Sequence, residues 1–361
     1  MQKIYSYFYY ISILLIYSLT TAQKHPVDTL KIMFVGDIMN HGPQLRAAYN
    51  SSTGEYDFSG NFTYVQPVFS KAHMVVGNLE TPVGLKPYAG YPQFSAPPAL
   101  VTACKQAGIG VLATANNHAC DKRKKGIIAT LDVLDSLQVY HLGTYRNQRE
   151  KDSLTPLLVP VAGVQVALLN YTYGTNGLPV PYPTKVNLID KQKIKEDIAK
   201  AKAKNPDILM VFLHWGEQYH NKPDKAQKEL AAFIRGQGVD LIIGSHPHVI
   251  QAVDYEMDVL NNRTYLTAYS LGNFISNQRT APRDGSMILS LNLTRNSQGN
   301  WQVAGYETIP IWVYKYQKDK KWHYEILPVE DFKLQPEYFT QNADYQKMMR
   351  YYKHYQQLMK P

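Results

Sequence analysis

Cysteine is scarce in this sequence: the 361-residue chain contains only Cys104 and Cys120. At most one disulfide can therefore form, and the sequence leaves open whether the two residues pair or stay apart as buried thiols. Hydrophobic residues make up 45% of the chain, enough to bury a substantial core. No repeat, low-complexity tract or obvious linker divides it. We expect one large domain at residues 30–316, followed by a C-terminal extension at 317–361.

The N-terminal apolar stretch is too short for a membrane helix. It runs from Ile4 to Leu19, below the roughly 20 residues that a span requires. Lys3 precedes it and Thr20-Thr21-Ala22 follows, a pattern typical of a secretory signal peptide, here residues 1–22, cleaved after Ala22. No cysteine follows for lipid attachment. We expect export to the periplasm or the exterior, with membrane contact only if the segment stays uncleaved.

An arginine-rich patch interleaved with aromatic residues is also missing, which argues against nucleic acid as a partner. Removing residues 1–22 takes away one lysine and no acid, so the formal charge falls from +9 to +8. This mild positive charge fits an anionic polymer or a phosphoester substrate. The lysines between Lys191 and Lys204 are expected to form one solvated helix face.

Several apolar runs end in residues suited to metal or phosphate chemistry. In α/β sheets the ligand site lies beyond the carboxyl ends of the strands, so these residues should gather at one rim. The runs and the polar segments that follow them are 32–35 before Asp37 and His41, 74–76 before Asn78 and Glu80, 111–113 before Asn117 and His118, 208–213 before His214, 240–244 before His246 and His248, and 266–268 before Asn273.

The segment His246-Pro247-His248 predicts a metal-binding loop. Neutral imidazole is a common ligand of divalent transition metals, and the proline restricts the backbone so that both rings can converge. A surface loop that happens to hold two histidines is the alternative. Asp37 is a candidate ligand but also suits a turn or a helix cap. Glu80 could bridge two cations or cap the turn before the next proline.

The remaining candidates also have two interpretations each. Asn117 can offer an amide oxygen to a metal, and His118 can protonate a leaving group or stabilise charge, although the pair also suits a turn. His214 stands where a strand-end ligand is expected. His41 could reach the site if a helical turn follows Asp37, or it could lie on the surface.

Two loops are predicted to form walls of the substrate-binding cleft. The proline-rich segment 88–98 should form one wall, and Tyr173, in the segment 171–174 that follows a strand, should form another. Asn78 and Asn273, from the ligand motifs themselves, are assigned to substrate binding as well.

The hydrophobic periodicity and the positions of glycine and proline predict the main helices and strands. Segments 287–293, 301–306 and 311–316 alternate as strands and are expected to build a second sheet. The terminal helix should dock on the domain. Helices are predicted from Pro97 or Pro98 to Gly108 and at 126–137, 190–205, 229–238 and 342–360.

These motifs together resemble the CapA family, known for poly-γ-glutamate capsule synthesis, over residues 31–280. The segments that carry the resemblance are 36–39, 78–80, 116–118, 214–216, 244–248 and 269–274. The family belongs to the calcineurin-like metallophosphoesterase superfamily. The resemblance therefore implies an α/β fold with four layers, an α-β-β-α sandwich of two mixed β-sheets flanked by helices.

The same resemblance implies a metal site and its ligands. Asp37 and His248 would hold a first metal, with His41 standing two residues later than the histidine of the superfamily's Asp-x-His motif. Glu80 would replace the bridging aspartate. A second metal would be held by Asn117, His214 and His246, and His118 would be the catalytic histidine. Such ligands suit two divalent ions, manganese, iron or zinc.

We therefore expect a capsule biosynthesis protein with a dinuclear, metal-dependent hydrolase-type site outside the cytoplasm. Its partners would be an anionic polymer or a phosphoester, together with other capsule-assembly proteins. The alternative is a non-catalytic component that keeps the fold and binds, exports or anchors the polymer. A positioned general acid at His118 favours the hydrolase, because a binding module does not need one.

Overall fold

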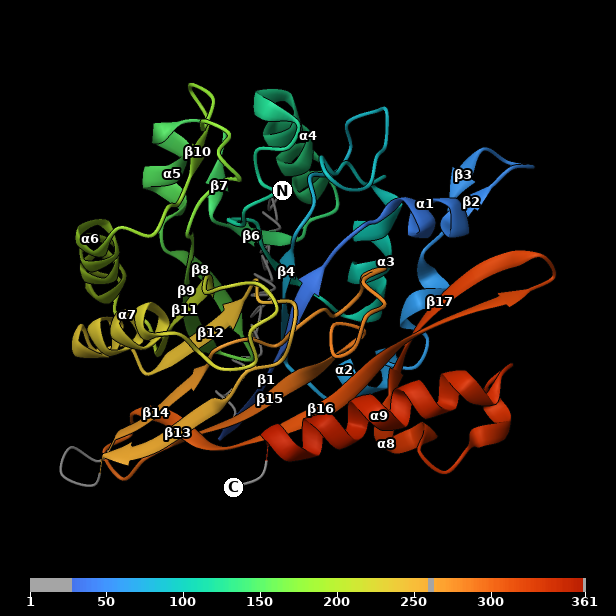
Figure 1. Cartoon of the computed structure of the whole chain (residues 1–361). Coiled ribbons are helices and arrows are strands. Elements are labelled where there is room, and N and C mark those ends of the chain that lie inside the picture. Colours follow the sequence, from blue (N-terminus) through green and yellow to red (C-terminus); the bar gives the residue numbers. More distant parts are fainter. Residues whose placement is uncertain (1–27, 259–262, 360–361) are drawn as a thin grey trace, which may run out of the picture.

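The computed structural model describes residues 28–258 and 263–359, so the predicted signal peptide lies outside the described residues. Two large β-sheets lie face to face, and helices cover both outer sides (Figure 1). This layering confirms the predicted α-β-β-α architecture. Within the described residues, no helix has the length and apolar character needed to cross a bilayer.

The first sheet has seven strands in the order β17-β16-β15-β1-β4-β5-β6. Strands β1, β4, β5 and β6 run parallel, whereas β15, β16 and β17 are added antiparallel beside β1. The central strand β1 is buried along most of its length, as its continuous apolar sequence requires. The strands are β1 Thr29–Ile38, β4 Met74–Leu79, β5 Val111–Ala113, β6 Tyr140–Leu142, β15 Gly285–Arg295, β16 Trp301–Lys318 and β17 Lys321–Pro328.

The second sheet has six strands in the order β13-β14-β12-β11-β9-β8. The four inner strands are parallel, and the edge strands β13 and β8 are antiparallel to their neighbours. The strands are β8 Leu157–Val161, β9 Val164–Thr172, β11 Ile208–His214, β12 Leu241–Ser245, β13 Val253–Asp258 and β14 Arg263–Ala268. Two small ribbons pair β2 Tyr49–Asn50 with β3 Glu55–Tyr56, and β7 Thr144–Tyr145 with β10 Lys185–Val186.

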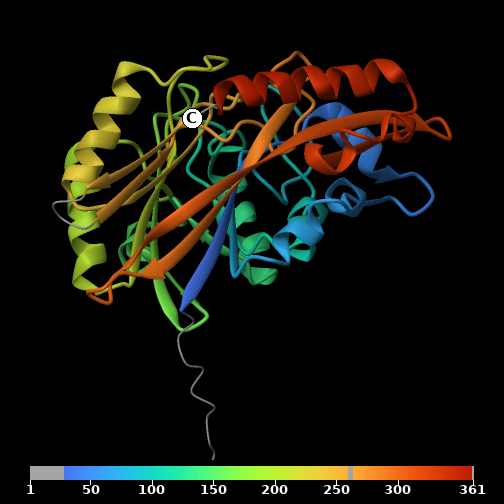
Figure 2. The same ribbon diagram turned by 90° about the horizontal axis from the view of Figure 1, so that it is seen from below.

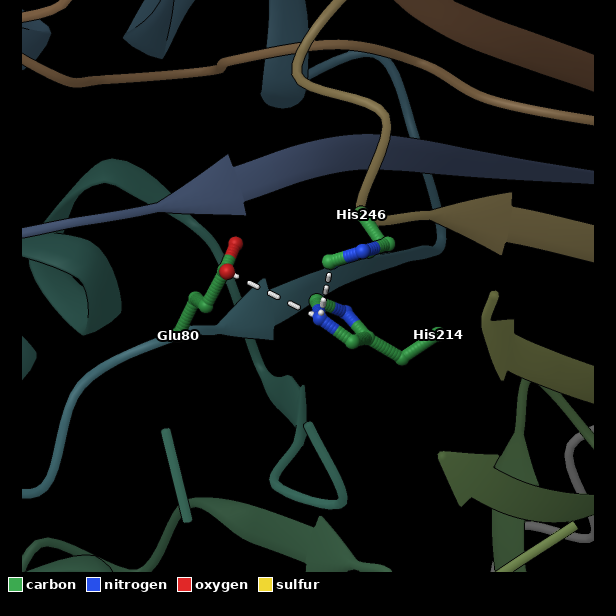
Figure 3. A group of neighbouring side chains, drawn as sticks. All are labelled: Glu80, His214 and His246. Carbon is green, nitrogen blue, oxygen red and sulfur yellow. Dashed lines mark hydrogen bonds and ion pairs between the residues drawn. The ribbon is translucent and has the colours of Figure 1, made fainter. Parts of the chain in front are cut away.

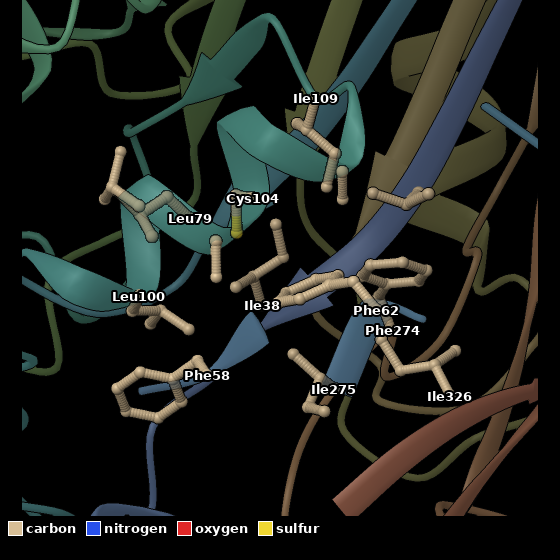
Figure 4. Packing of buried hydrophobic residues seen from close by; sticks show 14 of the residues in the cluster. Ile38, Phe58, Phe62, Leu79, Leu100, Cys104, Ile109, Phe274, Ile275 and Ile326 are labelled. Carbon is tan, nitrogen blue, oxygen red and sulfur yellow. The ribbon is translucent and has the colours of Figure 1, made fainter. Parts of the chain in front are cut away.

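Side chains alternate between two cores along β1. Ile32 and Phe34 lie in the core between the sheets, whereas Met33 and Val35 lie in an outer core beneath helices. Figure 4 shows part of this outer core, including Cys104. The helices that pack on it are α1 Gly42–Ala48, α2 Gln66–Phe69, α3 Ala99–Ala107 and α4 Arg123–Ser136. The outer face of the second sheet is covered by α6 Lys191–Ala203 and α7 Lys225–Gly236 (Figure 2).

The two cysteines do not pair. Cys104 and Cys120 are both buried free thiols, which decides between the alternatives that the sequence left open. Burial raises the pKa of Cys104 to about 12 and that of Cys120 to about 11. At neutral pH both are therefore protonated, unreactive thiols that fill space in the core.

Local signals predicted most helix boundaries. Helix α3 ends at Gly108, which adopts the left-handed conformation (φ 111°) that a glycine C-cap permits. The apolar residues Ile127, Leu131 and Leu134 of α4 are buried. Helix α7 begins before the predicted residue 229, because Asp224 caps it and forms a reciprocal capping box with Gln227. A short helix, α5 Gln148–Leu154, completes the central part of the chain.

The predicted role of the C-terminal strands was wrong. Segments 301–306 and 311–316 belong to one strand of 18 residues, β16, and this strand joins the first sheet through β15 instead of building a second one. The α/β crossovers occupy one side of β1, so its other edge is open for antiparallel addition. Local alternation identifies a strand but carries no information on which edge it joins.

The C-terminal segment shares the domain's structure. The predicted boundary between residues 316 and 317 falls inside β16, and β17 continues the same sheet. Helix α9 (Asn342–Leu358) buries Met348 and Tyr351 against Trp312 and Tyr314 of β16 (Figure 1). Short helices α8 (Val329–Phe332), η1 (Ser59–Phe62) and η2 (Pro336–Tyr338) lie beside this aromatic cluster or the neighbouring outer core.

Gly36 lies where two backbone segments approach closely. The strand continues through Gly36 to Ile38, and the backbone N–H of Asp37 donates to the carbonyl of Gly272 at 2.9 Å. A Cβ atom added at Gly36 would lie 1.9 Å from that same carbonyl oxygen. Glycine is therefore required because two backbones approach closely here, beside the first candidate ligand.

We expect Gly36→Ala to lower the free energy of unfolding by about 3 kcal/mol, because the added methyl group overlaps backbone that cannot move independently. Gly60→Ala is the control, since no atom lies within 4 Å of its added Cβ and its φ is negative. Urea unfolding of both variants and the parent chain measures the difference. Equal stability of the two variants would contradict the close approach.

Candidate metal centre

The candidate ligands gather where the parallel strands of both sheets end. Asp37 lies near the end of β1, Glu80 follows β4, Asn117 follows β5 and His214 is the last residue of β11. His246 and His248 follow β12. Ligands from segments more than 200 residues apart thus meet at one edge, as the position of strand-end motifs in α/β sheets predicts.

Two groups of ligand atoms share one carboxylate. The first group consists of Glu80, His214 and His246 (Figure 3), and the second consists of Asp37, Glu80 and His248. In each group the atoms lie within 4.8 Å of one another, and every member is buried. Glu80 is therefore placed to contact cations in both groups.

The first group converges on His214. Its Nε2 atom lies 3.0 Å from His246 Nδ1, 3.6 Å from Glu80 Oε1 and 2.8 Å from the amide oxygen of Asn117. Asn117 therefore belongs with this group, as the motif predicts. Ser245 Oγ lies 3.1 Å from Nδ1 of His214 and can accept its proton, which leaves the Nε2 lone pair for a cation.

The second group is supported by two asparagines. His248 Nδ1 lies 3.0 Å from Asp37 Oδ2, and its Nε2 lies 3.8 Å from Glu80 Oε1. The Asn78 amide donates to Asp37 Oδ1 at 2.8 Å, and Asn273 Oδ1 lies 3.0 Å from His248 Nδ1. Both asparagine side chains are buried behind the ligands. Their contacts favour a positioning role over the predicted contact with substrate.

The two histidines that follow β12 have a strained backbone conformation. His246 and His248 have φ values of 100° and 60°, in the left-handed region that residues with a Cβ seldom adopt. Such conformations cost about 1–2 kcal/mol per residue and persist where the surrounding packing enforces them. Pro247 lies between them, so the rigid loop predicted from the sequence consists of a proline flanked by two strained residues.

The electrostatics of the first group fit a cation. Both carboxylate oxygens of Glu80 are buried without a hydrogen-bond partner, and burial together with Asp37 raises the pKa of this carboxyl well above its usual range. Burial lowers the pKa of His246 to about 3 and that of His214 well below its usual value. The imidazoles are therefore neutral, with lone pairs available. A divalent cation would provide the partner that the Glu80 carboxylate lacks.

His118 is oriented by an acid that the sequence reasoning missed. Its Nδ1 atom lies 2.8 Å from Asp121 Oδ2, and that oxygen also accepts the backbone N–H of Phe94 at 2.7 Å. The Phe94 ring packs edge-on against His118, with centroids 4.6 Å apart. An acid three residues after a candidate catalytic histidine was the available signal. The pair fixes the ring and leaves its other nitrogen for substrate.

A cleft of about 700 Å³ opens beside these ligands. Tyr91, Pro92 and Gln93 line it, as expected of the proline-rich segment 88–98. Other lining residues are Asn117, His118, Asn176, Tyr219, His248 and Arg283.

His41 and Tyr173 lie at the margins of the site. His41 lines the cleft but belongs to neither ligand group. No helical turn separates it from Asp37, because α1 begins at Gly42 and His41 is its N-cap residue. Burial lowers the pKa of His41 to about 4. Tyr173 is half exposed and packs on His246 with ring centroids 4.6 Å apart, a position open to substrate.

Two facing mixed sheets with buried carboxylate and imidazole side chains at their shared edge define an α/β protein with a candidate metal centre. The chain belongs to the family described as bacterial capsule synthesis protein PGA_cap, whose model matches residues 31–278. It is 31% identical over 286 residues to the capsule biosynthesis protein CapA of Bacillus anthracis. It is 30% identical over 285 residues to the PGA biosynthesis protein CapA of Bacillus subtilis (strain 168).

These matches cover 74% and 77% of this chain. They span 65% of the B. anthracis protein, less than two thirds of its length, and 71% of the B. subtilis protein. The NAD nucleotidase of Haemophilus influenzae overlaps 91% of this chain and 67% of its own, with 13% identity and a TM-score of 0.48. A putative 5′-nucleotidase of Staphylococcus aureus overlaps 90% of this chain and 58% of its own, with 12% identity and a TM-score of 0.48.

Proposed function

We propose that this protein acts in capsule biosynthesis outside the cytoplasm, as a hydrolase that uses two divalent cations on an anionic polymer or a phosphoester. The observation that carries the proposal is the Glu80 carboxylate, which belongs to both ligand groups and has no hydrogen-bond partner for either oxygen. The names of the two Bacillus relatives support the capsule context and, for the B. subtilis protein, PGA as the polymer.

The residues divide into two cation sites with one shared member. Glu80, Asn117, His214 and His246 would hold one cation, and Asp37, Glu80 and His248 would hold the other. Bound divalent cations supply Lewis-acid polarisation of an anionic substrate and a lowered pKa of water.

His118 is positioned to transfer a proton. Asp121 accepts from its Nδ1 and fixes the ring at the cleft wall. The ring can then give a proton to a leaving group or stabilise negative charge on the substrate. This arrangement supports hydrolysis over the alternative of a component that only binds or anchors polymer.

Export is part of the proposal and rests on the leader pattern of residues 1–22. We expect the protein recovered from the culture fluid or the periplasm of an expressing bacterium to begin at Gln23, because the small residues before it suit signal peptidase. N-terminal sequencing and intact mass measure this. A mature protein that retains residues 1–22 in the membrane fraction would show an uncleaved anchor instead.

The cation stoichiometry follows from the shared carboxylate. After removal of metal and titration with Mn²⁺ or Zn²⁺, we expect two equivalents bound to the parent chain and none to Glu80→Gln, which loses a ligand from both groups. His246→Gln should keep one equivalent, because it belongs to one group. Calorimetry and elemental analysis give the counts.

The control for this titration is His220→Gln, an exposed histidine that pairs with Glu217 outside the ligand groups. It should bind two equivalents. A single equivalent in the parent chain, or two in Glu80→Gln, would contradict the two-cation proposal.

Turnover should depend on His118 without a change in metal content. We expect His118→Gln to lower kcat by about 10²–10⁴-fold and Asp121→Asn by about 10-fold, because the first removes the proton donor and the second only its orientation. A chromogenic phosphodiester and a γ-linked glutamate oligomer are the two substrates to assay. Full metal content with no turnover of either in the parent chain would favour the polymer-binding alternative.

A further inference from the structure

One cationic side chain lines the cleft, and three more lie near residues of its lining. Arg283 lines the cleft directly. Lys315 of β16 donates to the side-chain oxygen of Asn277 at 3.1 Å, and Asn277 is another lining residue. Arg279 follows the lining residue Gln278, and Arg46 belongs to α1, which begins beside the lining residue His41. The charges of both residues lower the pKa of Lys315, after the larger effect of burial. We call these residues, Arg46, Arg279, Arg283 and Lys315, the basic rim.

Arg46 is close to His41 because His41 is the N-cap residue of α1 and Arg46 lies one turn further along this helix. Its Nη1 atom lies 3.5 Å from the position of a Cβ at Gly42, the residue that follows His41. The backbone N–H of Asn277 in turn lies 3.3 Å from His41 Nδ1. The rim therefore begins at the cleft wall and continues from α1 across the segment 277–283 to the strand β16.

The rim is not neutralised by the protein. Among the described residues, none of the four cations has a carboxylate oxygen within 4.0 Å, whereas Arg146 elsewhere pairs with three acids. Asp121 is the acid that lines the cleft, and it is bonded to His118. The charges of Asp284 and Asp344 act on Arg279, but neither acid forms an ion pair with it, and Oδ2 of Asp284 accepts the indole N–H of Trp312 at 3.0 Å. Like charges held together without counter-ions favour an anionic ligand.

Aromatic rings hold the rim in place without supplying acceptors. The Lys315 ammonium lies 4.8 Å from the ring centroid of Trp322, and the guanidinium of Arg283 lies 4.4 Å from that of Tyr219. Arg279 lies 5.2 Å from the ring centroid of Trp312, and its Nη1 is buried without a hydrogen-bond partner. Cation–π contacts fix the side chains while most N–H donors stay available. The unpartnered nitrogen points to a missing acceptor.

Most of the rim lies outside the part of the chain that matches the family model. That match ends at residue 278, before Arg279, Arg283 and Lys315. These three residues come from the segment after β14 and from a strand of the C-terminal hairpin. Three of the four rim residues therefore lie beyond the family match, and Arg46 lies within it.

We propose that the basic rim binds successive carboxylates of an acidic polymer beside the metal centre. A single phosphate or carboxylate at the metals would leave cations on three separate elements without a partner, whereas a chain with recurring carboxylates reaches all of them. This inference rests on the proposed function, because it places the polymer in the same cleft. The rim fixes the direction in which the polymer leaves that cleft, across β16.

The test measures binding in a chain that cannot cleave the probe. The metal-loaded full chain carries His118→Gln, and the probe is a fluorescein-labelled γ-linked glutamate decamer followed by fluorescence anisotropy. We expect Arg46→Gln, Arg283→Gln and Lys315→Gln combined to weaken binding by about 10-fold at low salt, and to flatten its salt dependence.

The matched control removes the same number of positive charges at positions away from the cleft. Lys195→Gln, Lys228→Gln and Lys353→Gln combined remove three exposed lysines of α6, α7 and α9 and should leave the Kd within about twofold. Equal weakening by both triple variants would overturn the proposal, since only net charge would matter. Displacement of the decamer by glutamate or inorganic phosphate at similar concentrations would also overturn it. Neither result depends on turnover, so this binding test is independent of the test of hydrolase activity.

Discussion

The burial of the Glu80 carboxylate is the constraint on which the site depends. A charged group removed from water is stable only with a partner, and neither oxygen of Glu80 has a hydrogen-bond donor. Asp37 adds a second acid beside it, while burial keeps His214 and His246 neutral. The surrounding imidazoles therefore contribute lone pairs in place of positive charge. Cations would be the partners that these carboxylates and neutral imidazoles lack, and the geometry therefore indicates a candidate metal centre.

The packing of the two sheets fixes the positions of the side chains in this centre. Parallel strands from both sheets end at one edge, and backbones there approach so closely that Gly36 and Gly244 leave no space for a Cβ. The left-handed conformations of His246 and His248 are maintained by this packing, since nothing local favours them. The antiparallel strands β15–β17 fill the open edge of the first sheet and bring Lys315 to the cleft. The C-terminal elements thus complete the fold and extend the site with positive charge.

Much of the site could be predicted because the signals are local. An apolar strand followed by an acid, amide or imidazole is visible in sequence, and parallel topology places such ends together. Asp121 was missed because an acid in a turn is common, and only its 2.8 Å contact with His118 gives it a role. The positioning contacts of Asn78 and Asn273 were missed for a similar reason, since burial of an amide behind a ligand depends on long-range packing. The C-terminal strands were identified as strands but assigned to the wrong sheet.

The sequence by itself determined which residue types end each strand, where most helices begin and end, and which family the motifs resemble. These properties depend on neighbours a few residues apart, through side-chain periodicity, capping and the backbone preferences of glycine and proline. Only the tertiary structure decided that Glu80 is shared by two groups, that His41 lies outside both, and that the cysteines stay apart. It also decided that Arg283 lines the cleft and that Lys315 contacts the lining residue Asn277. These outcomes depend on which strands pair and how closely the sheets approach, and burial then fixes charge states and contacts between residues distant in the chain.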